Sequence, residues 1–151
     1  MSANTAKVVN DKELAIAFGK VSKFINPNQR TAMLSNCYGE EGEHFVNTFK
    51  SLGTLIDEMP VTHGQEGKGK KAIAYLHYFV SNCDWYVTEK DIEGGVLQAF
   101  GYCVVSNSLE SGRFRYINIT ELLLVGAELD LYFTPKALDE ILSEICSEVS
   151  A

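Results

Sequence analysis

The spacing of apolar residues predicts three helices in the first part of the chain. The first covers residues 11–24, and the Asn26-Pro27 pair ends it because the residue before a proline avoids helical backbone. A short second helix is expected over residues 28–36, and residues 40–59 carry the clearest helical pattern. The apolar stripe of the first helix consists of Leu14, Ile16, Ala17, Val21 and Phe24. That of the third consists of Phe45, Val46, Phe49, Leu52, Leu55 and Ile56.

Aromatic and β-branched runs predict strands in the second half of the chain. Residues 72–80 are apolar on both faces, which is typical of a central strand. Residues 84–90 and 97–105 flank a turn at 91–95 that contains two glycines, so these two runs are expected to pair as a hairpin. After a polar loop, residues 113–119 alternate and predict a further strand.

The end of the chain is predicted to return to helix. A short helix starts at Thr120 and ends at Gly126, and residues 129–133 are extended. Thr134 is typical of an N-cap, with Pro135 in the favoured first helical position. The apolar face of this last helix consists of Leu138, Ile141, Leu142 and Ile145.

These elements predict the α+β class, with a mainly antiparallel sheet of about four to five strands packed with N-terminal and C-terminal helices. We expect a flexible leader over residues 1–10 and one domain over residues 11–151. Within that domain a helical part (11–59) precedes a basic loop (60–71), and the sheet with the C-terminal helices covers 72–147.

Composition and charge limit the classes of function and the cellular location that we expect. Of the 151 residues, 46% are apolar and 22% charged, which is ordinary for a globular protein. The net charge of −7 disfavours binding to nucleic acid, which needs clustered Lys and Arg. The four cysteines lie far apart, no signal peptide opens the chain, and no apolar stretch approaches the length of a membrane span. We therefore expect a cytoplasmic protein with no membrane association.

Metal and cofactor sites are not indicated. The three histidines lack the spacing of metal ligands, and no residue is proposed as catalytic. His77 lies in an apolar run, where a histidine is either a hydrogen-bonded core residue or a proton carrier. The glycine-rich segment 64–71 (GQEGKGKK) has the wrong spacing for a phosphate-binding loop and is followed by a strand, so a solvated loop is expected.

Trp85 and Glu89 are the sharpest candidate residues. On one strand, positions 85, 87 and 89 share a face, which places Glu89 at the strand end next to Asp91 and the turn. A carboxylate at an aromatic-lined sheet edge can act as a general base with a raised pKa. The alternative is a solvated carboxylate, or an ion pair with Lys90 or Arg115.

Four further residues are candidates for binding. Arg113 and Arg115 share one strand face and are expected near Tyr102 and Tyr116, and Arg and Tyr are enriched at binding hot spots. Basic and aromatic residues on a sheet also stack single-stranded bases. The alternative is that the arginines face acidic residues on a neighbouring strand.

The end of the chain is acidic. From Glu121 onward, Lys136 is the single basic residue against seven acidic ones. The acidic residues are Glu121, Glu128, Asp130, Asp139, Glu140, Glu144 and Glu148. Such a face is usually solvated, and it also suits docking onto a basic protein.

The C-terminal two-thirds resembles a known family. Its ordered motifs are CDWYVTEKD (83–91), AFGYCVV (99–105), ESGRFRYINITEL (110–122) and ELDLYFTPKALDEI (128–141). This order is similar to that of a bacterial, plasmid and phage family catalogued as domain of unknown function 2958, over about residues 71–141. The chain departs from it by inserting Phe114-Arg115 where the family has an acidic-leucine-glycine turn. The resemblance implies a mobile-element setting and carries no catalytic residue across.

The function expected from these observations is a non-enzymatic protein-binding module of a phage or plasmid that inhibits a host defence system. One alternative is a small enzyme or nucleotide-binding domain with a sheet-edge pocket, formed by Glu89, Asp91, His77 and Arg115. Another is single-stranded nucleic-acid binding through Arg113, Arg115 and exposed tyrosines. A protein partner is expected, and a homodimer is compatible with the sequence.

Overall fold

The computed structural model describes residues 11–150, and the expected leader at residues 1–10 lies outside them. The chain divides into two compact units, one up to Glu58 and one from Met59. The boundary falls where the predicted helical part ends. Each unit is described by itself, and the expectation of one domain stays a prediction.

The first unit is helical. It contains α2 (Asp11–Val21), the 3-10 turn η1 (Ser22–Phe24), α3 (Pro27–Asn36) and α4 (Gly42–Glu58). The α3 helix starts as its sequence indicates, because the Asn26 side chain accepts a hydrogen bond from the Gln29 N–H and Pro27 takes the first turn. The predicted stripe of the first helix is buried except for Ile16, which is 54% exposed.

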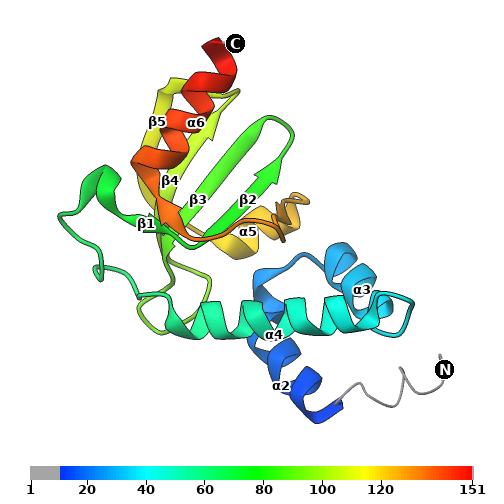
Figure 1. Ribbon diagram of the computed structural model, residues 1–151. Coiled ribbons are helices and arrows are strands. Elements are labelled where there is room, and N and C mark those ends of the chain that lie inside the picture. Colours follow the sequence, from blue (N-terminus) through cyan, green and yellow to red (C-terminus); the bar gives the residue numbers. More distant parts are fainter. Residues whose placement is uncertain (1–10, 151) are drawn as a thin grey trace. The chain divides into compact units, whose positions relative to one another are not determined.

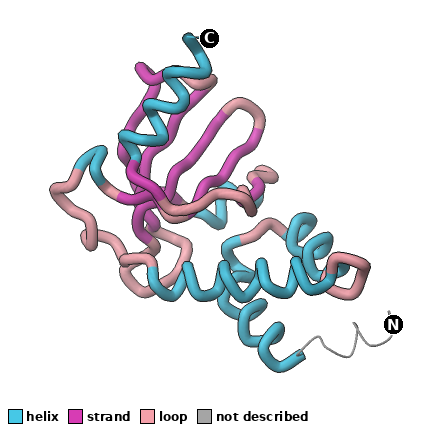
Figure 2. Tube along the Cα trace, viewed as in Figure 1, coloured by secondary structure: helices cyan, strands magenta, loops and turns pink. Residues whose placement is uncertain are grey.

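The second unit is built on a five-stranded antiparallel sheet of order β5-β4-β3-β2-β6. Its strands are β2 (Leu76–Val80), β3 (Cys83–Glu89), β4 (Ala99–Val105), β5 (Ser108–Ile117) and β6 (Glu128–Leu129); the ribbon and tube views follow the same path (Figure 1, Figure 2). The predicted hairpin is confirmed, since β3 and β4 pair from Cys83 and Val105 onward. The α+β class and the antiparallel sheet are likewise confirmed.

Several predicted boundaries are wrong. Residues 72–80 do not form one strand, because β1 (Ile73–Ala74) leaves the large sheet and pairs with β7 (Lys136–Ala137). That pairing also overturns the cap at Thr134, since the last helix, α6 (Leu138–Ser150), begins only after β7. The polar loop before residue 113 is a tight turn at Ser106 and Asn107, both with positive φ, followed directly by β5.

The helix α6 covers one face of the large sheet (Figure 1). The predicted apolar face of this helix is confirmed, because its four residues are buried together with Tyr86, Tyr102 and Val104 of the sheet. The α5 helix (Ile119–Leu124) begins at Asn118, whose side chain accepts the Glu121 N–H. No helix among residues 11–150 is long and apolar enough to cross a membrane.

Candidate functional site

A β-bulge at the end of β3 decides where Glu89 lies. Tyr86 pairs with Tyr102 and Val87 with Gly101, but the next partner, Phe100, pairs with Glu89 because Thr88 is the extra residue. Glu89 therefore shares the sheet face of Tyr86, Tyr102 and Phe100. The expectation that Glu89 lies on the face of Trp85 and Val87 is wrong, since strict alternation does not hold across a bulge.

The Glu89 carboxylate is buried, with only 4% of the residue exposed. Its Oε1 accepts a hydrogen bond from the His63 backbone N–H at 2.7 Å, and its Oε2 accepts one from the Thr88 hydroxyl at 3.2 Å. None of the ion pairs within the described residues involves Glu89. A buried carboxylate with acceptor capacity left on both oxygens is the result.

The basic loop is fastened next to this carboxylate. The Gln65 side-chain amide donates to the carbonyls of Ile73 and Thr88, at 2.8 and 2.9 Å, and its oxygen accepts the Ile73 N–H at 2.7 Å. Gln65 is buried, so the expectation of a solvated loop over residues 64–71 is wrong at this residue. It holds for Lys68, Lys70 and Lys71, which are exposed.

Between this loop and the sheet lies a cavity of about 420 Å³. One wall is aromatic: the Phe100 and Phe114 rings are stacked with centroids 6.0 Å apart, and Tyr116 meets Phe100 edge to face at 5.3 Å. Thr62, Gln65, Thr88 and Glu89 provide the polar lining, and Glu66, Gly67 and Gly69 come from the loop. We call this cavity the Glu89 pocket.

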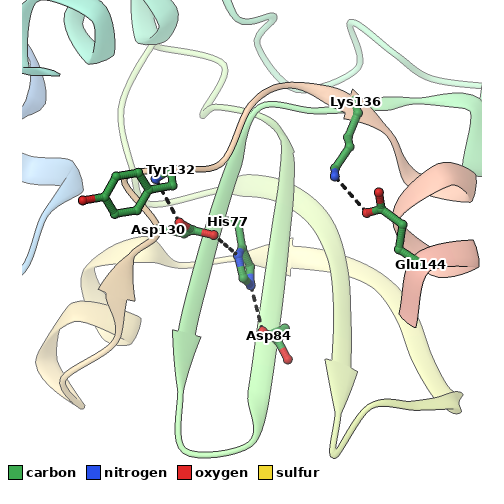
Figure 3. Close-up of polar contacts among 6 residues, drawn as sticks. All are labelled: His77, Asp84, Asp130, Tyr132, Lys136 and Glu144. Atoms are coloured by element: carbon green, nitrogen blue, oxygen red, sulfur yellow. Dashed lines mark hydrogen bonds and ion pairs between the residues drawn. The ribbon is translucent and has the colours of Figure 1, made fainter. Parts of the chain in front are cut away.

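A second polar cluster lies on the same sheet face, around His77 (Figure 3). Its ring contacts two carboxylates, Nε2 with Asp84 at 2.7 Å and Nδ1 with Asp130 at 3.0 Å. Because carboxylates only accept, both contacts are hydrogen bonds only when both ring nitrogens carry a proton. The ring also stacks on Tyr86, with centroids 4.6 Å apart.

The electrostatics of the cluster agree with a charged imidazolium. Burial works to lower the pKa of His77, but the hydrogen bonds and negative charges of Asp84 and Asp130 outweigh it, so the pKa is raised above its usual value. Asp130 is also fixed by its backbone, because its N–H donates to the His77 carbonyl at 2.8 Å. The cluster therefore joins β2, β3 and the segment after β6.

The predicted site residues are divided between the two faces of the sheet. Trp85 pairs with Cys103, which pairs with Arg113, and Arg115 is opposite Gly101, so Trp85 and the arginines share the face away from Glu89. Tyr102 and Tyr116 lie on the Glu89 face, where Tyr102 is buried and Tyr116 lines the pocket. The expected surface of arginines next to tyrosines is therefore not formed.

Two of the predicted residues bind their own backbone surroundings. The Asp91 carboxylate accepts the N–H groups of Glu93 and Gln98, at 2.8 and 2.9 Å, and so holds the turn before β4. The Arg113 guanidinium donates to the carbonyls of Glu110 and Gly112 rather than to a neighbouring carboxylate. Glu89, Asp91, His77 and Arg115 consequently do not converge in one pocket.

Two of the cysteines, Cys37 and Cys103, are buried. Burial raises the pKa of the Cys37 and Cys103 thiols, which makes thiolates there scarce at neutral pH. Among residues 11–150, no three His, Cys, Asp or Glu side chains are arranged to hold a metal ion.

The sequence analysis did not predict the side chains that surround His77 and Glu89. The pairing of His77 with Asp84 was within reach, because a two-residue turn after β2 places His77 opposite Tyr86 and diagonal to Asp84. Gln65 and Asp130 carried no local signal, since their contacts are made 23 and 53 residues away along the chain.

Comparison of the chain with models of protein families, with curated proteins and with solved structures finds no match. The resemblance to domain of unknown function 2958 therefore stays a prediction.

Proposed function

We propose that this protein is a binding module and that the Glu89 pocket is its working site. The observation that carries the proposal is a buried carboxylate that lines an aromatic cavity and has no basic side chain as an ion-pair partner among the described residues. The ligand is a small, flat molecule that carries hydrogen-bond donors. This matches the sheet-edge pocket among the functions expected from the sequence, without the convergence of His77, Asp91 and Arg115.

Energetics support this proposal. Moving a carboxylate out of water costs on the order of several kcal/mol. Hydrogen bonds or a countercharge must offset this loss. Two hydrogen bonds hold Glu89, and both of its oxygens can accept another. A donor from a ligand would complete that shell. The cavity volume of about 420 Å³ lies within the range of small-molecule sites.

The test is a binding screen by protein NMR, with benzamidine, guanidinium and purine as probes. Probe-induced shifts should be confined to the amides of the pocket, such as those of His63, Glu89 and Phe114. The Phe114→Ala variant should weaken binding at least about tenfold, which is the loss expected for a stacking ring. Phe79→Ala is the matched control, because both side chains are 39% exposed and Phe79 lies outside the pocket. Equal losses in the two variants would count against the site.

Docking onto a basic protein is a second candidate function. It is supported by the outer face of α6, where Glu140, Glu144 and Glu148 are exposed. Lys136 contacts Glu144 at 2.8 Å, and Lys71 contacts Asp139 at 3.2 Å, which leaves Glu140 and Glu148 outside the ion pairs of the described residues. A Glu140→Lys, Glu148→Lys variant should lose a basic partner recovered from lysate. Unchanged recovery would remove this candidate. The mobile-element setting and defence inhibition stay predictions.

A further inference from the structure

We infer that the ligand of the Glu89 pocket is a guanine nucleotide. This inference rests on the proposed function and names the chemistry of the ligand. Three features of the pocket each select one part of such a molecule: the carboxylate selects the edge of the base, the aromatic wall its face, and the lysine-rich loop its phosphate.

The carboxylate selects the base edge. Its two oxygens each hold one protein donor, from His63 and Thr88, and each can accept one more hydrogen bond. A ligand with two adjacent N–H donors on one edge would bind both oxygens side by side, as an arginine fork does. Among nucleobases, guanine presents this pattern through N1–H and the N2 amino group. Adenine and cytosine place an acceptor nitrogen next to their amino group, and that lone pair would face the carboxylate.

The aromatic wall selects a flat ring. Phe100 of β4 and Phe114 of β5 stack with nearly parallel planes, at an interplanar angle of 8°. Phe114 and Tyr116 are 39% and 55% exposed, so part of their ring surface is open to a ligand. Stacking of a base on such rings is sequence-tolerant, and the choice of base is therefore left to Glu89.

The loop selects the phosphate. Gly67 and Gly69 line the pocket, and Lys68 and Lys70 are their neighbours in the chain. With Lys71, these lysines concentrate positive charge in one short segment of a protein whose net charge is −7. Lys71 is mostly exposed although it pairs with Asp139. Glu66 lies at the same mouth, and its carboxylate contacts the His63 ring at 3.1 Å.

The glycines make room for an anion at this mouth. A Cβ placed at Gly67 or Gly69 would meet nothing within 4 Å, and both residues have positive φ. The backbone there follows a path that residues with side chains rarely adopt. A phosphate group can therefore approach the loop closely. Lys68 is exposed beside it, and the Lys70 Nζ lies 6.0 Å from the centroid of the Tyr102 ring.

The experiment is isothermal titration calorimetry of the full chain with GMP, AMP, guanosine and inorganic phosphate. GMP should bind at least about tenfold more tightly than AMP, since a mismatched edge leaves a buried carboxylate against a lone pair. Glu89→Gln should remove the preference for GMP over AMP. A Lys68→Ala, Lys70→Ala variant should weaken GMP about tenfold and reduce its salt dependence, while guanosine is unaffected. Lys23→Ala, an exposed lysine outside the pocket, is the control.

Each result decides one part. Equal affinities for GMP and AMP, or a preference that survives Glu89→Gln, would overturn the assignment of the base. Equal affinities for GMP and guanosine would overturn the phosphate. If benzamidine binds in the pocket and no nucleotide does, the guanine assignment fails and the binding function stands. If neither kind of probe binds to a chain with native circular dichroism, both fail.

Discussion

Two acidic sites on one face of the sheet are built in opposite ways. Around His77, two carboxylates share one imidazole, and every polar atom of the ring has a partner within the protein. In the Glu89 pocket, one carboxylate is buried without a basic partner among the described residues and borders a cavity of about 420 Å³. The first arrangement is internally complete and holds strands together. The second is complete only with something added, and this difference separates a structural cluster from a candidate binding site.

The comparison can be broken at its common support, which is β3. A Cβ at Gly101 would overlap the Tyr86 carbonyl and come within 2.9 Å of the Val87 Cα. Gly101→Ala must therefore push β3 and β4 apart, at a cost of about 3 kcal/mol in the free energy of unfolding. Urea unfolding measures this cost, and it should disturb both the His77 cluster and the pocket.

Gly94→Ala is the control for that substitution. Gly94 has positive φ, but a Cβ added there would meet nothing within 4 Å, so only backbone strain is expected, about 1 kcal/mol. If the two glycine variants are equally stable, the close approach of β3 and β4 at Gly101 does not contribute to the free energy of unfolding as proposed.

The comparison is sharpened by removing one charge from each site, a positive one at His77 and a negative one at Glu89. His77→Gln leaves Asp84 and Asp130 without their shared cation and should cost about 2 kcal/mol. The side chains are 15–30% exposed, which keeps this below the value for fully buried pairs. Glu89→Gln removes a buried charge and keeps an oxygen to accept the His63 N–H, so we expect a change within about 1 kcal/mol. Equal losses in urea unfolding would show that Glu89 is as structural as His77.

The smallest effect is in the dependence of stability on pH. The pKa of His77 is raised above 6.5 in the folded state. At pH values between the unfolded and the folded pKa, the folded protein therefore binds more protons than the unfolded protein does. Its contribution is complete below the unfolded pKa and is lost as the pH rises through the folded one. The free energy of unfolding should therefore fall from pH 6.5 upward, by at most about 1.4 kcal/mol per pH unit.

Comparing variants isolates this titration. His77→Gln should flatten the slope over that range, and Glu89→Gln should keep it. A wild-type slope that survives in His77→Gln would assign it to another group.

The parts of the fold that were predicted correctly are those indicated by residues close together in the sequence. The β3–β4 hairpin and the apolar face of α6 were found because aromatic runs, a glycine turn and helical spacing are read from neighbouring residues. The division of residues 72–80 was missed because β1 pairs with β7, more than sixty residues later. The start of β5 was missed because Ser108 to Gly112 has the composition of a loop, while its neighbour β4 supplies the pairing.

The candidate site shows the same limit. Glu89 was singled out as a carboxylate at an aromatic sheet edge, while Tyr102 and Tyr116 were expected next to Arg113 and Arg115. Trp85 was placed on the face of Glu89 because strict alternation along the strand was assumed. The bulge, the Gln65 contacts and the cavity arise from pairings between distant segments, so no local pattern in the sequence indicates them.

The extra residue at Thr88 has a consequence for how this protein can change over generations. Loss of one codon there would make the pairing regular, because the carboxylate would then follow Val87 directly, opposite Phe100 and still on the pocket side of the sheet. The deletion would remove the Thr88 hydroxyl that donates to Glu89 and the Thr88 carbonyl that accepts from Gln65. Relatives of this chain can therefore keep the acid of the pocket and differ in how firmly the loop is held beside it, and the length of the segment between Val87 and Lys90 is where that difference would be written.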